Sequence, residues 1–572
     1  MSDPRNAPLR DPMPRWLRAC YVDRQVPAIN IIALPSAASR PVTRPAASLL
    51  RHSTAFAVVL LAVHTGGAWL ARKPGILLGH NDAMYVALGQ SLRRLNYLEL
   101  WYSSTPPHAM YPPVYPAVLA VLETIHGGGF HWLVWSNLLA STAALALLFA
   151  AVRTTWGPLP ALGCLAVLAV NPTIVAAAGT LGAETQMMLA ISVVVYSLAH
   201  EQRGPHMSVL AGLGALVAAL LRSAAVPLVA AVALYWLLKR QYKRFAIYSL
   251  ASALSVGSWL LWSAAAPNQS AGRSYVGDAM LMASHAGVVS ELLSRIAAHL
   301  PRYAAIVYWE LPMPTLRGFA LDNAIGGPLA LAALVVGFVA IARAWTAAGL
   351  FMVLYGVLLS IWPYIEDRFV APIIPLVVTC TAIGCITMMR SRTRVAVVVG
   401  SGILVALIAT GALSVASAAA RGASCNRDDF FPDPACLTPA EREFLDAMRY
   451  IRDKTPADAV FLSAKPATLY YYTGRRSVIR ELAAGQRPEA FLSFLKSQRA
   501  KYLLLGRADY MEVHRFAPRI RAICDALDVE QRIDAAVYLF RVREDAVAGN
   551  GDACEAMERY DREVKYRPST SR

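Results

Sequence analysis

Charged residues that could take part in catalysis stand at the ends of apolar runs in this sequence. They are Asp82, Glu184, Arg222 and the triplet Glu366-Asp367-Arg368. A carboxylate can accept a proton during a reaction, and a guanidinium can stabilise a developing anion. Ionisable groups beside apolar segments are costly, which makes this set a candidate functional site. The alternative interpretation of each residue, taken alone, is a solvated charge at the end of a loop with no catalytic role.

The elements that would position these residues are apolar runs. The chain has 572 residues, of which 56% are hydrophobic and 16% are charged, whereas soluble domains carry about 25% charged residues. Lengths near 20 residues suit helices that cross a bilayer. The sequence therefore predicts an α-helical polytopic membrane protein with about eleven transmembrane helices. The runs are 53–71, 130–152, 158–178, 184–199, 207–221, 223–238, 245–264, 326–343, 345–363, 369–389 and 395–418.

One further run, 112–127, is short and contains three prolines, Glu123 and His126. We expect it to be re-entrant or interfacial. With eleven spans, every major basic loop shares the side of the N-terminus, which the positive-inside rule makes cytoplasmic. Counting 112–127 as a span would put all of these loops outside. The basic loops carry Arg153, Arg203, 239–244, Arg343 and 390–394.

The two ends of the chain differ from the membrane module, 53–420. Residues 1–52 are rich in Arg, Pro and Ala, a composition that cannot bury a core, so we expect a disordered cytoplasmic leader. Residues 421–572 are predicted to form a small soluble α/β or α+β domain outside the membrane. The module itself carries two long outer loops, 73–129 and 265–325, and the second is expected to cover a groove for a lipid. In the tail, the expected helix is 439–454 and the expected strands are 459–463, 502–505 and 536–541.

Four of the eight cysteines lie in the tail. An even number suggests two disulfides and an oxidising compartment, and four free thiols in a cytosolic tail are the alternative. Four cysteines allow three connectivities. The simplest pairs Cys425 with Cys436 and Cys524 with Cys554.

The formal net charge of +17 does not indicate nucleic-acid binding, because the basic residues lie mainly between apolar runs and in the tail. The sequence has no RNP-like aromatic pattern and no zinc-ligand spacing. It also lacks a Walker A motif and a dinucleotide-binding glycine pattern, which argues against a soluble nucleotide donor.

An ordered series of short motifs resembles the superfamily C glycosyltransferases, polytopic enzymes that use polyprenyl-phosphate-linked sugars. The resemblance is to the protein O-mannosyltransferase-like and aminoarabinose-transferase-like bacterial branch. Two positions depart from it: many relatives have aspartate in place of Glu184, and an arginine-tyrosine pair in place of Arg368-Phe369. The motifs are 79–92, 111–116, Asn171-Pro172 ahead of 182–184, Leu221-Arg222, 366–369, and in the tail 450–456, 460–463, 465–466 and 472–475.

The resemblance implies transfer of a sugar from a polyprenyl phosphate to an acceptor hydroxyl on the outer face of a bacterial inner membrane. Asp82 is then the general base, and Arg222 and Arg368, with Lys465 from the tail, bind the donor phosphate. Glu184 would orient the acceptor, pair with an arginine, or hold a divalent metal together with Asp82. No cofactor is required on this interpretation, although a divalent metal is possible.

Two more residues, Tyr85 and Asp367, are expected to position the substrate. Tyr85 belongs to 83–95, a segment that fits a helix on the membrane surface or an ordinary helix packed on the bundle. The acceptor remains open among glycan, lipid and protein. The competing functions are a transporter or lipid flippase, which predicts charges near the bilayer midplane, and a membrane-anchored scaffold or sensor.

Overall fold

The computed structural model describes residues 44–566 apart from 77–80, 128, 267–273, 276, 278–286, 311–326, 363–365, 426–429, 508, 510 and 544–551. Most of the expected leader, 1–52, lies outside these residues. The chain divides into two units, Met1–Leu50 and Arg51–Arg572.

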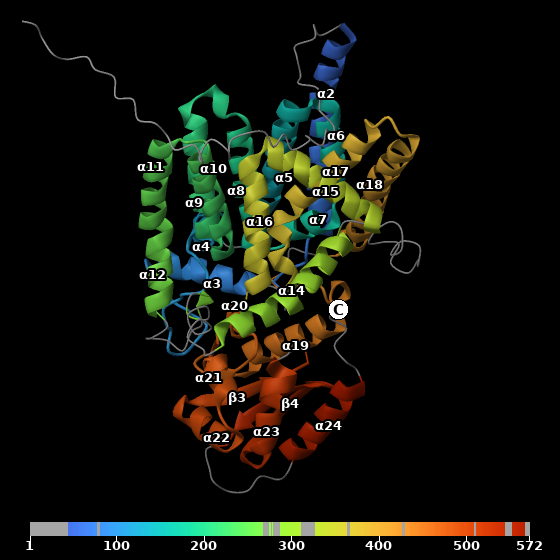
Figure 1. Ribbon diagram of the computed structural model, residues 1–572. Helices are drawn as coiled ribbons and strands as arrows, with labels where there is room; N and C mark the ends of the chain where they lie inside the picture. Colours follow the sequence, from blue (N-terminus) through green and yellow to red (C-terminus); the bar gives the residue numbers. More distant parts are fainter. Residues whose placement is uncertain are drawn as a thin grey trace, which may run out of the picture. The chain divides into compact units, whose positions relative to one another are not determined.

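As the apolar runs predicted, the described residues up to 423 are mainly α-helical (Figure 1). Each predicted run is helical over most of its length. By length and apolar composition alone, six of the described helices can cross a membrane, and the bent pair α6 and α7 makes a seventh. The remaining four predicted spans form shorter apolar helices. The helices of these runs are α2 (Arg44–Ala71), α5 (Phe130–Trp156), α6 (Pro158–Ala169), α7 (Pro172–Ala178), α8 (Ala183–Ala199), α9 (Pro205–Leu221), α10 (Val226–Leu238), α11 (Tyr242–Ser252), α12 (Ser258–Ala265), α15 (Gly327–Ala344), α16 (Thr346–Ile361), α17 (Ile374–Met389) and α18 (Arg394–Ala423).

The predicted run 158–178 is not one straight helix. It bends by 63° between α6 and α7. Pro172 lacks the N–H that would continue α6 and disfavours helical geometry at Asn171. The Asn171 side chain instead caps α7 by accepting a hydrogen bond from the backbone N–H of Ile174 at 3.1 Å. The bend brings the short α7 and the loop after it beside the start of α8.

Small residues allow α15 and α17 to pack closely. A Cβ at Gly337 would collide with the Cys380 carbonyl, and one at Gly384 would collide with the Ala333 carbonyl. Such close backbone contact is typical of membrane helices, whose association relies on packing and not on the hydrophobic effect. The contact fixes α17, the helix that follows Arg368.

Three of the described α-helices before the C-terminal domain lie outside the predicted spans. The segment 83–95, expected either to lie on the membrane surface or to pack on the bundle, forms α3 (Asp82–Leu92), whose residues are mostly buried. The short run forms α4 (Val114–His126). The 13 residues of α4 extend only about 20 Å, which is less than the roughly 30 Å hydrocarbon core. The segment 265–325, expected to be a loop, contains the 23-residue helix α14 (Val288–Glu310). Sequence reasoning missed α14 because its charged residues and Pro301 interrupt the apolar pattern.

The C-terminal domain is α+β. Its strands are β1 (Val460–Leu462), β2 (Arg476–Ser477), β3 (Ala500–Leu505), β4 (Leu527–Asp534) and β5 (Val537–Val542), in the order β2-β1-β3-β5-β4. β1 pairs in parallel with β2 and β3, and β5 pairs antiparallel with β3 and β4. The helices are α19 (Pro439–Lys454), α20 (Pro466–Thr473), α21 (Arg480–Gly485), α22 (Pro488–Ser497), α23 (Ala517–Ala522) and α24 (Asp552–Tyr566).

The prediction for the tail located β1, β3, β5 and α19 but missed two strands. β2 has only two residues, too few for a pattern. β4 is half-buried and rich in charged residues, as suits a strand at a sheet edge. Disulfides join Cys425 to Cys436 and Cys524 to Cys554, the simplest of the pairings that the sequence allows.

The C-terminal domain contacts the segment 73–129 directly. The Tyr472 hydroxyl donates a 2.7 Å hydrogen bond to the Ile76 carbonyl, and α20 packs on α3. The backbone of Ser477 in β2 exchanges hydrogen bonds with Trp101 and Ser103, at 2.8 and 2.9 Å. The loop that carries Asp82 is therefore held by the soluble domain as well as by the bundle.

Candidate active site

Asp82 begins α3 and is buried, with 1% of its surface exposed. Among the described residues, neither carboxylate oxygen has a hydrogen-bond partner of ordinary geometry. Burial raises the pKa of Asp82 to about 7, against the opposing effects of the Lys73 ammonium and the backbone N–H of Leu181. A carboxyl group with this pKa exchanges its proton near neutral pH, which suits general base catalysis.

Lys73 lies between the end of α2 and α3. Its backbone N–H donates to the Gly179 carbonyl at 3.2 Å. A Cβ at Gly179 would lie 2.7 Å from the Cα of Arg72, so this approach needs glycine. Burial lowers the pKa of Lys73, while the nearby Asp82 carboxylate opposes that shift. Lys73 is therefore close enough to Asp82 to interact with its charge.

Glu184 and Arg222 form a buried ion pair between the first turn of α8 and the residue after α9. The Arg222 side chain is 5% exposed and that of Glu184 14%. A Cβ on Gly182 would collide with the Glu184 carboxylate, so the glycine leaves room for the carboxylate. The Asp82 and Glu184 carboxylates are close enough to repel each other.

Asn137 holds the loop that precedes Glu184. This fully buried side chain in α5 donates to the carbonyls of Thr180 and Gly182 at 2.6 and 2.9 Å. Its amide oxygen accepts from the Gln186 side chain at 3.1 Å. Because a buried amide with its hydrogen bonds satisfied rigidifies its surroundings, Asn137 fixes where α8 begins.

Arg368 lies in a 3₁₀ turn, Asp367–Phe369, and pairs with Glu366. The buried Phe369 ring lies 5.4 Å from the Arg368 guanidinium and 5.5 Å from that of Arg222. Cations are attracted to aromatic rings at such distances. Phe369 therefore links the two guanidiniums, and the tyrosine expected from the resemblance is not needed for this contact.

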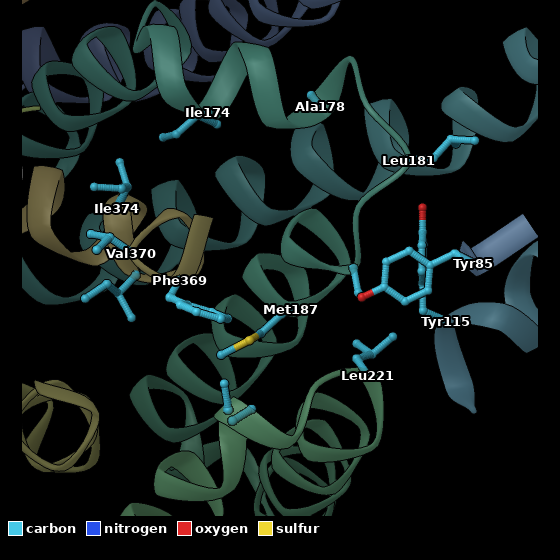
Figure 2. Packing of buried hydrophobic residues seen from close by; sticks show 14 of the residues in the cluster. Tyr85, Tyr115, Ile174, Ala178, Leu181, Met187, Leu221, Phe369, Val370 and Ile374 are labelled. Atoms are coloured by element: carbon cyan, nitrogen blue, oxygen red, sulfur yellow. The ribbon is translucent and has the colours of Figure 1, made fainter. Parts of the chain in front are cut away.

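Tyrosine rings connect the first outer loop to the arginines. Tyr85 packs 4.9 Å from Tyr115 and 5.1 Å from Tyr111, and Tyr111 lies 6.2 Å from Tyr275. Tyr85 is near enough to Arg222, Glu184 and Arg368 to interact with their charges. Figure 2 shows Tyr85 and Tyr115 beside Leu181, with Leu221, the residue before Arg222, on the other side. The predicted residues that this arrangement brings together are Asp82, Tyr85, Glu184, Arg222 and Arg368.

Two other predicted residues are not placed in this group. Lys465 pairs with Asp509 at 2.8 Å within the C-terminal domain. The side chain of Asp367 lies outside the described residues. Sequence reasoning missed Lys73 and Asn137. For Lys73, the only signal in the sequence was a basic residue between the first span and Asp82. For Asn137, it was a single amide side chain within an apolar run.

The basic loops gather at the other end of the helices. Thr154 lies 17 residues after Asn137 in α5, which corresponds to about 26 Å along the helix. Loops from four parts of the chain meet there through side-chain hydrogen bonds. These join Thr154 to His200 at 2.8 Å, Arg244 to Glu201 at 2.6 Å and Trp345 to Thr155 at 3.0 Å. The candidate site and the basic loops thus lie at opposite ends of the bundle, and the acidic and basic site residues do not lie at its middle.

One group of metal-binding residue types occurs among the described residues. The sulfurs of Cys524 and Cys554 and a carboxylate oxygen of Asp525 lie within 4.8 Å of one another. The sulfurs form a disulfide, so this cluster offers thiolate ligands only after reduction. At the candidate site, Asp82 and Glu184 have no third acidic, histidine or cysteine ligand among the described residues.

The fold, with several apolar helices followed by a small sheet domain, is shared with solved structures that include an oligosaccharyltransferase, and it agrees with the fold that the resemblance implied. The chain is similar to ArnT from Cupriavidus metallidurans in the apo state, with 14% identity and a TM-score of 0.54 over 86% of this chain and 98% of that chain. The structure of the same ArnT bound to undecaprenyl phosphate matches with 14% identity and a TM-score of 0.53, over 87% of this chain and 99% of that chain. The chain is also similar to an Archaeoglobus fulgidus oligosaccharyltransferase in complex with zinc and sulfate. The sequence identity is 11% and the TM-score is 0.52, over 86% of this chain and 74% of that chain. No family model and no curated protein sequence matches the chain.

Proposed function

We propose that this protein is a glycosyltransferase that moves a sugar from a polyprenyl phosphate to an acceptor hydroxyl. The observation that carries the proposal is the buried Asp82 carboxyl, with a pKa of about 7, in one site with two guanidiniums. The fold supports it, because ArnT of the same architecture is found with undecaprenyl phosphate and an archaeal oligosaccharyltransferase with dolichol phosphate.

In the proposed reaction, the acceptor oxygen attacks the anomeric carbon while the bond from that carbon to the phosphate oxygen breaks. The acceptor proton passes to Asp82, and the polyprenyl phosphate leaves with an additional negative charge. Arg222 and Arg368 stabilise that charge. Glu184 keeps Arg222 in place, and Tyr85 positions the sugar. Lys465 and Asp367 keep the roles expected from the resemblance, phosphate binding and substrate positioning.

An apolar groove next to Arg368 supports a lipid donor. It has a volume of about 560 Å³, and its lining is almost wholly apolar. The lining includes Leu300, Tyr303, Leu331, Leu359, Val370 and Ile373. Val370 and Ile373 follow Arg368-Phe369 in the chain. An isoprenoid in this groove would therefore place its phosphate near Arg368, and in this proposal α14 covers the bound lipid.

We further propose that the site faces the outside of a bacterial inner membrane, with the N-terminus cytoplasmic and the C-terminal domain periplasmic. The clustering of basic loops at the end opposite the site supports this orientation. The two disulfides in the C-terminal domain suit an oxidising compartment. The acceptor is a glycan, lipid or protein.

We propose that no divalent metal is required. Glu184 is already neutralised by Arg222, and Asp82 faces Lys73, so two carboxylates with cationic neighbours are a poor donor set for a hard cation. Sugar transfer in the presence of EDTA should match transfer without it. A loss of activity that Mg²⁺ or Mn²⁺ restores would assign a metal to Asp82 and Glu184. A transporter or flippase is not favoured, because the site charges lie at one end of the helices.

The proposal can be tested with membranes that contain equal amounts of wild-type protein or Asp82→Asn. Each is incubated with radiolabelled polyprenyl-phosphate sugars and an extract of native acceptors, and label transfer is scored. We expect transfer by the wild type and a loss of at least a hundredfold in the variant. Equal transfer by both proteins would remove Asp82 from catalysis, and no transfer from any donor would count against the proposed function.

A further inference from the structure

A second cavity, of about 850 Å³, lies where α3 and α4 meet the C-terminal domain. Its volume is within the usual range for ligand sites, roughly 300–1,000 Å³. It differs from the apolar donor groove because polar and apolar groups contribute to its lining in similar measure. The lining residues that matter for its chemistry are Gln90, Arg93, Glu123, Phe430, Tyr470 and Tyr471.

Aromatic rings form one wall of this cleft. Phe430 stacks on Tyr471, with ring centres 5.4 Å apart and an interplanar angle of 27°. Phe430 is 52% exposed, and Tyr470 and Tyr471 are partly exposed. The adjacent Tyr472 is instead buried and uses its hydroxyl within the protein. The Cys425–Cys436 disulfide closes the segment that carries Phe430. The protein thus keeps these rings at the surface of the cleft.

Planar polar groups form another part of the lining. Glu123 in α4 is buried, and its Oε1 accepts from the Gln90 amide at 3.5 Å. Its Oε2 lies 3.6 Å from the Arg93 guanidinium, and within the described part of the chain it accepts no hydrogen bond. All three groups line the cleft. The lining of the cleft therefore combines these polar groups with aromatic rings.

Contacts within the protein link the lining of the cleft to the candidate active site. Ile76 lines it and accepts the hydrogen bond from Tyr472. Tyr472 is close enough to Asp82 to interact with its charge. A ligand held by Tyr471 and Gln90 would therefore contact α3, the helix that begins with Asp82.

We propose that this cleft binds the carbohydrate of an acceptor glycan. A sugar ring has an apolar C–H face, which packs on aromatic rings, and a rim of hydroxyls, which pair with carboxylate, amide and guanidinium groups. The polar part of the lining suits neither an isoprenoid nor an acyl chain. The proposal rests on the glycosyltransferase function and narrows the acceptor from glycan, lipid or protein to glycan.

The test separates binding from transfer. Full-length Asp82→Asn protein in lipid nanodiscs, fluorescently labelled, is applied without donor to an array of defined neutral and acidic bacterial oligosaccharides. A parallel array carries unstructured peptides rich in serine and threonine. Tyr471→Ala and Gln90→Ala are made in the same background. Tyr242→Ala is the matched control, because Tyr242 is 61% exposed and lies at the start of α11, with the basic loops.

We expect retention on at least one oligosaccharide class, a tenfold or greater loss in Tyr471→Ala and Gln90→Ala, and no change in Tyr242→Ala. Unaltered retention in both cleft variants, or retention on no oligosaccharide, would overturn the proposal. Retention on the peptides alone would assign the cleft to a protein acceptor and would also overturn it. Glycan binding that depends on the cleft, together with no sugar transfer by the wild type from any donor, would leave the glycan site standing and reject the glycosyltransferase function.

Discussion

The Arg222 guanidinium donates to the Glu184 carboxylate inside the helical bundle, and both side chains are largely buried. Removing one partner of such a pair leaves an unpaired buried charge, at a cost of roughly 3–5 kcal/mol. Replacing both by neutral groups avoids that cost. The pair therefore allows the stability role of these residues to be separated from their role in sugar transfer.

We expect Arg222→Ala to lower both the Tm in nanodiscs and kcat, the latter by a hundredfold or more, because the leaving phosphate loses a guanidinium. The double variant Glu184→Gln/Arg222→Met should recover most of the Tm and none of the activity. Thermal unfolding and transfer kinetics are measured on the same preparations. If the double variant recovers activity with stability, Arg222 serves the fold alone.

The activity should depend on the ionisation of Asp82. Its pKa is about 7, so kcat/KM is expected to rise with pH through about 7 and then level off. The ordinary pKa of 3.8 applies to the unfolded chain. Between these values the folded state holds a proton that the unfolded state has released, so this group makes stability fall as pH rises from about 4 to about 7.

Asp82→Asn removes the loss of stability that comes from ionising the buried carboxyl group, and it also removes the general base. The variant should be inactive but should have a higher Tm than the wild type at pH 8, with a difference that shrinks towards pH 4. Unfolding is followed in nanodiscs across that range. A variant less stable than the wild type at pH 8 would show that Asp82 is not a buried, unsatisfied carboxylate.

Much of the architecture could be predicted because bilayer-spanning helices need long apolar runs. All eleven runs are helical. The convergence of Asp82, Glu184, Arg222 and Arg368 could be predicted as well, since each stands at a loop end on the same side. This inference needed only the alternation of spans across the membrane and the positive-inside rule.

Other features depend on contacts between distant parts of the chain. Asn137 lies within an apolar run, and its function is visible only once its amide reaches the carbonyls of 180–182. The two-residue strand β2 gains a neighbour from the loop at Trp101. The amphipathic α14 covers a groove that forms only when α15 and α16 are in place. Local patterns carry no information about such pairings.

Lys73 provides a test of how Asp82 is tuned. Its ammonium favours the charged carboxylate, so Lys73→Met should raise the pKa of Asp82. The midpoint of the pH profile of kcat/KM should then move to higher pH by roughly one unit, because one nearby opposite charge is lost. The plateau at high pH should be retained. An unchanged midpoint with a lower plateau would instead indicate that Lys73 binds substrate.

The donor groove offers a substitution that fills space without disturbing the fold. Gly356 in α16 lines the groove, and a Cβ at this position would meet no atom within 4 Å. Gly356→Phe should therefore enter the groove and compete with the isoprenoid, raising the donor KM tenfold or more with little change in kcat. Gly402→Phe is the control, because Gly402 in α18 also has no atom within 4 Å of its Cβ and does not line the groove.

Donors with isoprenoid chains of different length provide a second test of whether the isoprenoid lies in this groove. A donor with only two isoprene units would occupy less of the groove, so the same variant should affect it less than an undecaprenyl donor. Initial rates are measured at several concentrations of each donor. Equal effects of Gly356→Phe on both donors, or equal effects of the two glycine variants, would show that the isoprenoid lies elsewhere. A selective effect on the long donor would place the chain against Leu359 and Val370, so that its phosphate reaches Arg368.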